Sequence, residues 1–375
     1  MAPKNPRRKN AKPRKSTRNR NPRTMPAAAA TGPVTLAQAR ALAGVRAPAA
    51  RGAKLALAAA PGSPAAVGLE RRKLRKKQEL EQRQRIKEYK ATLEIMKKRG
   101  VKGLQPKRAK AAKGGPPASA AGTGPLQVFA EGDSWFDYPP FEFPLSPFGD
   151  GGIIPRLQKK LGVPILNLAK AGDEVRYMLG VKERKVLIEQ FVNGCPAGGL
   201  WDAMLFSGGG NDIVDNPMAL WVRDYNPTLP PQALVHQARF DAALALVRAG
   251  YEDLITLRDQ LSPSTHLFFH GYDFAIPDNR GICHLGPWLW PTFELRGFPS
   301  EAAAFAVMKV MLTKFADMLR TLTQPGRVTF IPTQGTLPEQ TSSWHNELHP
   351  TKAGFEKFAA MFRQTLKAAF PTRVP

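Results

Sequence analysis

The chain has 375 residues, of which 43% are hydrophobic, and its formal net charge at pH 7 is +25. This is long enough and apolar enough for one large domain with an appendage, or for two domains, and excludes a wholly disordered polar chain. Residues 1–125 hold 32 Lys and Arg against 5 Glu, whereas the remaining residues hold 23 Lys and Arg against 25 Asp and Glu. The excess positive charge therefore belongs to a leader and not to the body.

Other classes of protein are disfavoured by what the sequence lacks. No apolar run is long enough for a transmembrane helix, and the basic N-terminus lacks the apolar core of a secretory signal. The two cysteines, Cys195 and Cys283, have no Cys or His neighbours at the spacing of a zinc site or a disulfide framework. We therefore expect a cytoplasmic protein without a metal site or a cofactor.

The leader divides into a tail, a linker, a helix and a second linker. Residues 1–24 carry ten Lys or Arg and no acidic residue, and they cannot bury enough apolar surface to fold alone. Residues 26–67 are rich in Ala, Gly and Pro, as linkers are. Residues 69–99 lack Gly and Pro and predict one long, solvent-exposed basic helix. Residues 100–124 again read as a linker, so we place the arm at residues 1–124.

Two functions are open for this arm. It is either a solvated, solubilising tail or an electrostatic anchor for a polyanion, such as nucleic acid, or for an anionic membrane surface. Aromatic residues do not alternate with the basic ones, so we do not expect sequence-specific reading of nucleic acid.

From residue 125 onward, short apolar runs alternate with segments of helical periodicity. This alternation predicts βαβ units, hence an α/β domain at 125–375 in which helices cover both faces of a five-stranded parallel sheet. Asp173 is expected to cap the second helix. The predicted strands are 126–130, 164–168, 203–206, 265–270 and 328–332, and the predicted helices are 153–161, 174–192, 235–261, 300–322 and 352–370.

Residues suited to acyl transfer follow several of these strands. A serine hydrolase needs an exposed nucleophile, a base that reaches it and N–H donors for the oxyanion. Ser134, after the first strand, is the candidate nucleophile, and His349, before the last helix, is the candidate base. The backbone N–H of Gly172 and the side-chain amide of Asn211 are candidate oxyanion donors. Because active sites of open α/β sheets lie at the carboxyl ends of strands, these residues should meet at one edge.

Each candidate also has a structural interpretation. Asn211 can cap the turn after the third strand, Gly172 can be a turn glycine without a ligand, and His349 can cap the last helix. The functional interpretation rests on all of them occurring together, in this order.

In this combination the chain resembles the SGNH or GDSL-type hydrolases, from about residue 126 to residue 370. The matching blocks are Gly132-Asp133-Ser134, Gly172, Gly209-Gly210-Asn211-Asp212 and His349-Pro350. The resemblance implies a flavodoxin-like three-layer fold and metal-independent hydrolysis of an ester, thioester or O-acetyl group. It also implies Ser134 as nucleophile, His349 as base, and an oxyanion hole formed by the Ser134 N–H, the Gly172 N–H and the Asn211 amide.

One position departs from the family pattern. The family has Asp three residues before the histidine, whereas this chain has Asn346. An Asn carbonyl can accept a hydrogen bond from imidazole but brings no charge, and in serine proteases an Asp-to-Asn change costs roughly ten-thousandfold in turnover. Asn346 is therefore either a weakened third triad member or irrelevant to a dyad in which a backbone carbonyl of residues 344–346 orients His349. We expect Glu347 to point elsewhere.

The long connection at residues 272–299 contains Trp288 and Trp290. Long ordered loops over a sheet edge are often functional, so we expect an apolar wall or lid for the acyl group. The alternative is that this loop covers an apolar sheet edge.

Three functions remain open from the sequence. The first is an SGNH-like acyl hydrolase, acting on a small-molecule or polymer-linked acyl ester, with a basic tethering arm. The second is a catalytically weak binding module of the same fold that acts on nucleic acid or an anionic surface through the arm. The third is an exported effector or envelope-acting deacetylase, which no sequence feature specifically supports.

Overall fold

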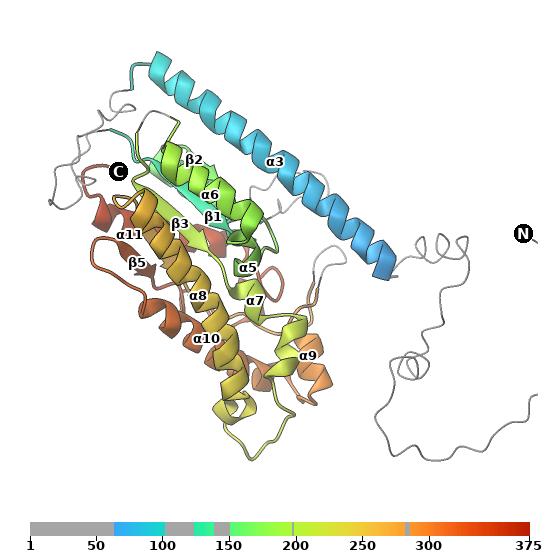
Figure 1. Cartoon of the computed structure of the whole chain (residues 1–375). Helices are drawn as coiled ribbons and strands as arrows, with labels where there is room; N and C mark the ends of the chain where they lie inside the picture. Colours follow the sequence, from blue (N-terminus) through green and yellow to red (C-terminus); the bar gives the residue numbers. More distant parts are fainter. Residues whose placement is uncertain (1–63, 102–123, 139–150, 197–198, 282–285) are drawn as a thin grey trace, which may run out of the picture. The chain divides into compact units, whose positions relative to one another are not determined.

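Five short strands form one parallel sheet in the order β2-β1-β3-β4-β5 (Figure 1). Val128 of β1 pairs with Ile165 of β2 on one side and with Ala203 of β3 on the other. This is the flavodoxin-like order, so the predicted five-stranded parallel α/β sheet is confirmed. The strands are β1 (Val128–Gly132), β2 (Ile165–Asn167), β3 (Ala203–Ser207), β4 (His266–His270) and β5 (Val328–Ile331).

The computed structural model describes residues 64–101, 124–138, 151–196, 199–281 and 286–375, and side chains of the first range from Lys76 onward. The predictions for residues 1–24, for Cys283 and for most of both linkers lie outside the described residues. Within the described ranges, none of the helices combines the length and the apolar character that crossing a membrane requires.

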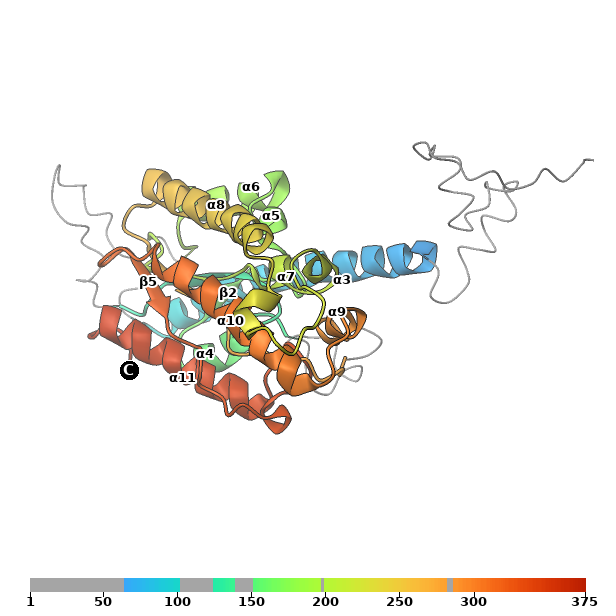
Figure 2. The same cartoon turned by 90° about the horizontal axis from the view of Figure 1, so that it is seen from below.

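Helices cover both faces of the sheet (Figure 2). On one face lie α4 (Ile153–Leu161) and α11 (Lys352–Ala369), and on the other lie α6 (Val181–Asn193) and α8 (Gln237–Leu261). α10 (Glu301–Arg320) packs against α8 and β4. Because both faces are covered, β1, β3 and β4 are buried along their whole length. This explains why they read as continuous apolar runs in the sequence.

The helix predicted over residues 174–192 is two helices. α5 (Val175–Met178) ends before Gly180, whose extended backbone (φ −69°, ψ 166°) starts α6. Glycine is costly inside a helix, and here the chain changes direction at it. The residue before α5 is Glu174, so the prediction that Asp173 caps this helix is wrong. A further helix, α9 (Trp290–Leu295), lies in the connection that the sequence analysis treated as a loop.

The basic helix of the leader is α3 (Pro64–Lys98), close to the predicted range of 69–99. The expectation that it is solvent-exposed is wrong for one face, because Tyr89 and Leu93 are buried. With Ile86 and Met96 they recur at the spacing of one helix face, a stripe that the density of charged residues obscured in the sequence. From Arg72 onward the chain forms one compact unit with the sheet.

Candidate active site

Ser134 lies on a tight turn directly after β1. A side chain at Gly132 would meet the Ser207 carbonyl oxygen at 2.7 Å, so this turn can approach β3 only with glycine there. The Asp133 carboxylate accepts a hydrogen bond from the Trp135 N–H at 3.0 Å and one from Ser207 Oγ at 2.8 Å. These contacts fix the backbone that carries Ser134.

The structure brings Ser134 and His349 together from opposite ends of the domain. The two atoms Ser134 Oγ and His349 Nε2 are 2.6 Å apart. His349 lies in a short loop before α11, where an isolated bridge between Trp344 and Pro350 closes the loop. Thr351 caps α11 by accepting the Gly354 N–H, so the helix begins directly after this loop.

Asn346 decides which nitrogen of His349 carries the proton. Its Oδ1 accepts from the backbone N–H groups of Leu348 and His349, both at 3.0 Å, and lies 2.9 Å from His349 Nδ1. Backbone N–H groups can only donate, so the atom that faces them is the amide oxygen. His349 Nδ1 must then carry the hydrogen, which leaves Nε2 as an acceptor for the Ser134 hydroxyl.

The surroundings keep His349 neutral. Burial, with a smaller contribution from nearby His345, lowers the pKa of His349 to about 3. The Tyr138 ring packs against the imidazole with ring centroids 4.3 Å apart. Tyr138 also accepts a hydrogen bond from Asn346 Nδ2 at 3.0 Å, so the amide is held at both of its ends. A neutral imidazole can take up the proton of an attacking hydroxyl.

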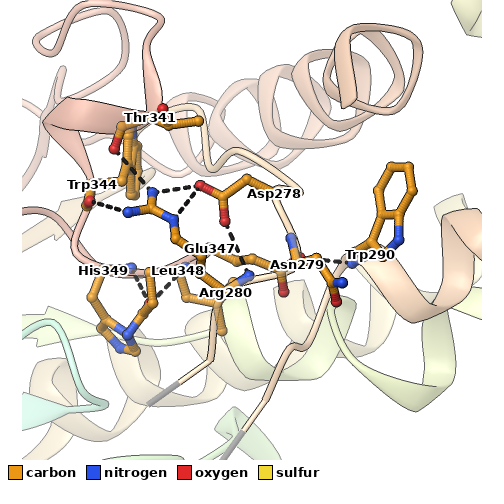
Figure 3. Close-up of polar contacts among 10 residues, drawn as sticks. Asp278, Asn279, Arg280, Trp290, Thr341, Trp344, Glu347, Leu348 and His349 are labelled. Carbon is orange, nitrogen blue, oxygen red and sulfur yellow. Dashed lines mark hydrogen bonds and ion pairs between the residues drawn. The ribbon is translucent and has the colours of Figure 1, made fainter. Parts of the chain in front are cut away.

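Glu347 points away from His349, as expected. Its carboxylate accepts backbone N–H groups of Asn279, Trp288, Leu289 and Trp290, at distances from 2.5 to 3.1 Å. Figure 3 shows Glu347 beside Asn279 and Trp290. Burial raises the pKa of Glu347, whereas these four N–H donors lower it. Glu347 thus ties the His349 loop to the segment that starts α9.

Arg280 makes a second link to the His349 loop. Its guanidinium donates to the carbonyl oxygens of Trp344 at 3.1 Å and Thr341 at 2.9 Å, and it pairs with Asp278 (Figure 3). Arg280 thus holds the start of the loop that carries Asn346 and His349, and Glu347 holds its middle.

The candidate oxyanion donors lie on two neighbouring loops. Asn211, in α7 (Gly210–Ile213), lines the same cavity as Ser134, and its Nδ2 donates to the Asp173 carbonyl at 2.8 Å. An amide carries two N–H donors, so this bond leaves one for a ligand. Gly172 directly precedes Asp173 and has φ of +80°, a backbone conformation that suits glycine, but it does not line the cavity.

The cavity beside Ser134 and His349 is small, about 30 Å³. Trp288 and Trp290 do not line it, although the Trp288 ring stands edge-on to His349 with centroids 6.0 Å apart. Their role as an acyl wall stays a prediction. The apolar lining residues are Trp135, Val214, Ala275, Met308, Leu312 and Leu348.

Sequence reasoning missed a buried polar network under the Ser134 turn. Tyr272 donates to Asp133 Oδ2 at 2.5 Å and accepts the Gly210 N–H at 3.1 Å. Ser207 donates to Asp133 Oδ1, and the atoms His270 Nε2 and Ser207 Oγ are 2.9 Å apart. Burial lowers the pKa of His270 to about 3 and raises that of Asp133 to about 6. The available signal was the polar residues at the strand ends, Ser207 in β3 and His270 in β4, with Tyr272 shortly after β4.

No group of three or more His, Cys, Asp or Glu side chains in the described part of the chain is arranged to hold a metal ion. The structure instead combines a flavodoxin-like sheet order with a Ser–His–Asn hydrogen-bonded series at the carboxyl edge of the strands. This is the geometric class of triad-type serine sites on α/β folds.

Comparison with known proteins gives structural neighbours only. Neither a family model nor a curated protein matches the chain. A lipase from a goat rumen metagenome is 18% identical, with a TM-score of 0.41 over 65% of this chain and 97% of that chain. A putative platelet activating factor from Streptococcus pneumoniae is 14% identical, with a TM-score of 0.42 over 80% of this chain and 98% of that chain. An extracellular lipase from Streptomyces rimosus is 14% identical, with a TM-score of 0.40 over 64% and 99%. Other similar structures are described as putative GDSL-like lipases and as a putative SGNH hydrolase.

Proposed function

We propose that this chain hydrolyses acyl esters, with Ser134 as nucleophile, His349 as general base and Asn346 as the residue that orients the base. The observation that carries the proposal is the 2.6 Å separation of Ser134 Oγ and His349 Nε2, in a tautomer that makes Nε2 an acceptor. A serine that faces a neutral, oriented imidazole inside a cavity is the arrangement that nucleophilic acyl transfer requires.

The reaction proceeds in two halves. Ser134 Oγ attacks the acyl carbonyl carbon while its proton moves to His349 Nε2, and the carbonyl oxygen becomes an oxyanion. The Ser134 N–H, the Gly172 N–H and the Asn211 amide are the proposed donors to that oxyanion. Collapse breaks the bond to the leaving alcohol or thiol, which takes the proton from Nε2. Water then attacks the carbonyl carbon of the acyl-serine and gives its proton to His349 Nε2. The bond from the acyl carbon to Ser134 Oγ breaks, Oγ takes the proton from Nε2, and the carboxylic acid leaves.

The test is hydrolysis of a p-nitrophenyl ester series by the wild type, Ser134→Ala and His349→Ala. We expect both variants to lose at least about a thousandfold in kcat, because each removes a member of the reacting pair. Ser342→Ala, at an exposed serine, is the matched control and should retain full activity. Mass spectrometry after treatment with a fluorophosphonate should place the adduct on Ser134. Equal activity in Ser134→Ala and wild type would refute the proposal.

The arm suggests a second, separable activity. Residues 1–125 carry 32 basic residues against 5 acidic ones, a charge that attracts polyanions at low salt. We propose that the arm holds the enzyme near a polyanion or an anionic membrane surface. Deleting residues 1–63 removes 14 of these basic residues. It should weaken salt-dependent binding to a mixed-sequence nucleic acid and to anionic vesicles, and should leave ester hydrolysis intact. Unchanged binding after the deletion would contradict this role.

A further inference from the structure

Helix α3 contacts the loop that carries Gly172. Side chains from one face of the helix donate to three carbonyl oxygens of this loop: Gln82 to Leu168 at 2.9 Å, Arg85 to Ala169 at 3.0 Å and Gln78 to Ala171 at 2.8 Å. The spacing of 78, 82 and 85 places the three donors on one helix face. The loop therefore receives hydrogen bonds from a segment more than 80 residues earlier in the chain.

Arg85 also reaches the turn that carries Ser134. Its guanidinium donates to Asp137 Oδ1 at 2.6 Å, and the Asp137 N–H donates to the Asp133 carbonyl within that turn. The side chains of Arg85 and Asp137 are only 16% and 6% exposed, so solvent screens this pair little. One guanidinium thus joins the Ser134 turn to the Gly172 loop.

Asp137, which follows the Ser134 turn, also interacts with the Gly172 loop directly. Burial raises the pKa of Asp137 to about 7, whereas Arg85 and the Ala171 N–H lower it. Ala171 directly precedes Gly172. The Lys170 N–H in turn donates to the Gly132 carbonyl at 2.8 Å, so the two loops also touch through their backbones.

Farther along the same helix face, apolar contacts hold α3 in place. Tyr89 and Leu93 are buried, and the Tyr89 ring lies 5.9 Å from the Trp201 ring. Burial of these two side chains stabilises the packing of α3 on the body of the domain, and so helps to keep its polar donors over the loop.

We propose that α3 is a brace for the acyl-transfer site and that Arg85 is a positioning residue, which holds the Gly172 loop and the Ser134 turn at a fixed separation. The inference rests on the proposed function, because its consequence for rate requires that the nucleophile Ser134 lies on one of these loops and that one oxyanion donor, the Gly172 N–H, lies on the other. It assigns to the leader helix a part in catalysis that is distinct from polyanion attraction.

The first test compares Arg85→Met with Arg83→Met in the full-length chain. Arg83 is exposed on the same helix and serves as the matched control. Arg85→Met should lower kcat for a short-chain ester roughly 10- to 100-fold with KM nearly unchanged, since a displaced donor costs mainly transition-state stabilisation. Arg85→Lys keeps the positive charge but lacks the planar guanidinium with its several N–H donors. Its kcat should therefore lie between those of Arg85→Met and the wild type. Equal kcat in Arg85→Met and Arg83→Met would overturn the proposal.

The second test does not depend on activity. Hydrogen exchange of backbone amides in residues 168–173 and 133–137 should be faster in Arg85→Met than in Arg83→Met, because the bonds that bridge the two loops are lost. If Ser134-dependent hydrolysis is never observed, this measurement still decides whether the brace exists, and unchanged exchange would overturn it. Gln82→Ala removes a single bond and replaces Arg85→Met if that variant does not fold.

Discussion

Asn346 Oδ1 lies 2.9 Å from His349 Nδ1 and also accepts two backbone N–H groups of the same short loop. The amide thereby fixes both the tautomer and the direction of the imidazole ring. It performs the orienting part of the role that an aspartate has in a serine triad, and it leaves out the charge. Variants at position 346 can therefore measure separately how much orientation of the imidazole and how much a negative charge contribute to kcat.

Replacing Asn346 with Asp should raise activity. A carboxylate beside Nδ1 stabilises the imidazolium that forms as Ser134 attacks. The opposite change costs serine proteases roughly ten-thousandfold, so we expect a gain of at least about tenfold in kcat at pH 8. Asn346→Ala is the companion variant. If it retains wild-type kcat, a backbone carbonyl orients His349 and the site is a dyad.

The pH profile of the wild type should extend into acid. Burial lowers the pKa of His349 from its ordinary value of about 6.5 to about 3, so the imidazole stays neutral as pH falls through 6 and 5. We therefore expect kcat/KM to stay level down to about pH 5. In Asn346→Asp the added charge raises the pKa of His349 and moves the acid limb to higher pH. Circular dichroism at each pH distinguishes protonation of His349 from unfolding of the protein. A fall in the wild-type kcat/KM centred near pH 6.5 would contradict the prediction.

Tyr272→Phe should destabilise the Ser134 turn. The substitution removes the hydroxyl that donates to Asp133 and accepts the Gly210 N–H. Leaving buried polar groups unpaired costs about 1–3 kcal/mol, so the free energy of unfolding should fall by that amount, and kcat should fall with it. Tyr225→Phe is the control, because it also removes a hydroxyl and keeps the ring, which here packs on Phe298. Equal denaturation midpoints for the two variants would show that the network does not stabilise the fold.

The small cavity predicts a preference for short acyl groups. A volume of about 30 Å³ beside Ser134 accommodates roughly one or two carbon atoms. Each further methylene is then worth about 1–3 kcal/mol against binding, so kcat/KM should fall steeply from acetyl to longer esters. Met308→Ala, at a buried lining residue, should shift the optimum to longer chains, whereas Leu295→Ala at an exposed position should not. An octanoyl ester hydrolysed as fast as the acetyl ester by the wild type would exclude this preference.

Periodicity predicted the sheet because each strand is a short apolar run ended by a turn. Ile153–Leu161 was predicted with its observed bounds, since Gly162 ends it in a left-handed conformation. The break at Gly180 was not predicted, because one glycine in a helical pattern is often tolerated. The buried face of α3 was also missed, because its stripe is short and interrupted by charged residues.

Ser134 and His349 were candidates from their positions at a strand end and before the last helix, and the resemblance to SGNH-type hydrolases added Asn346, three residues before His349. The structure brings the three together. Arg85, Tyr272 and Glu347 could not be recognised in this way. Their partners lie 52, 139 and 59 residues away in the chain, and nothing local to Arg85, Tyr272 or Glu347 distinguishes them from ordinary surface or core residues.

Because position 346 holds a neutral amide and not a carboxylate, the candidate site should respond little to ionic strength. Ser134, His349 and Asn346 carry no formal charge at rest, so dissolved salt has almost nothing to screen among them. The arm is the opposite, because any hold of its many cations on a polyanion must weaken steeply as salt displaces them. If both proposed functions hold, raising the salt concentration should release the chain from a polyanion while ester hydrolysis continues.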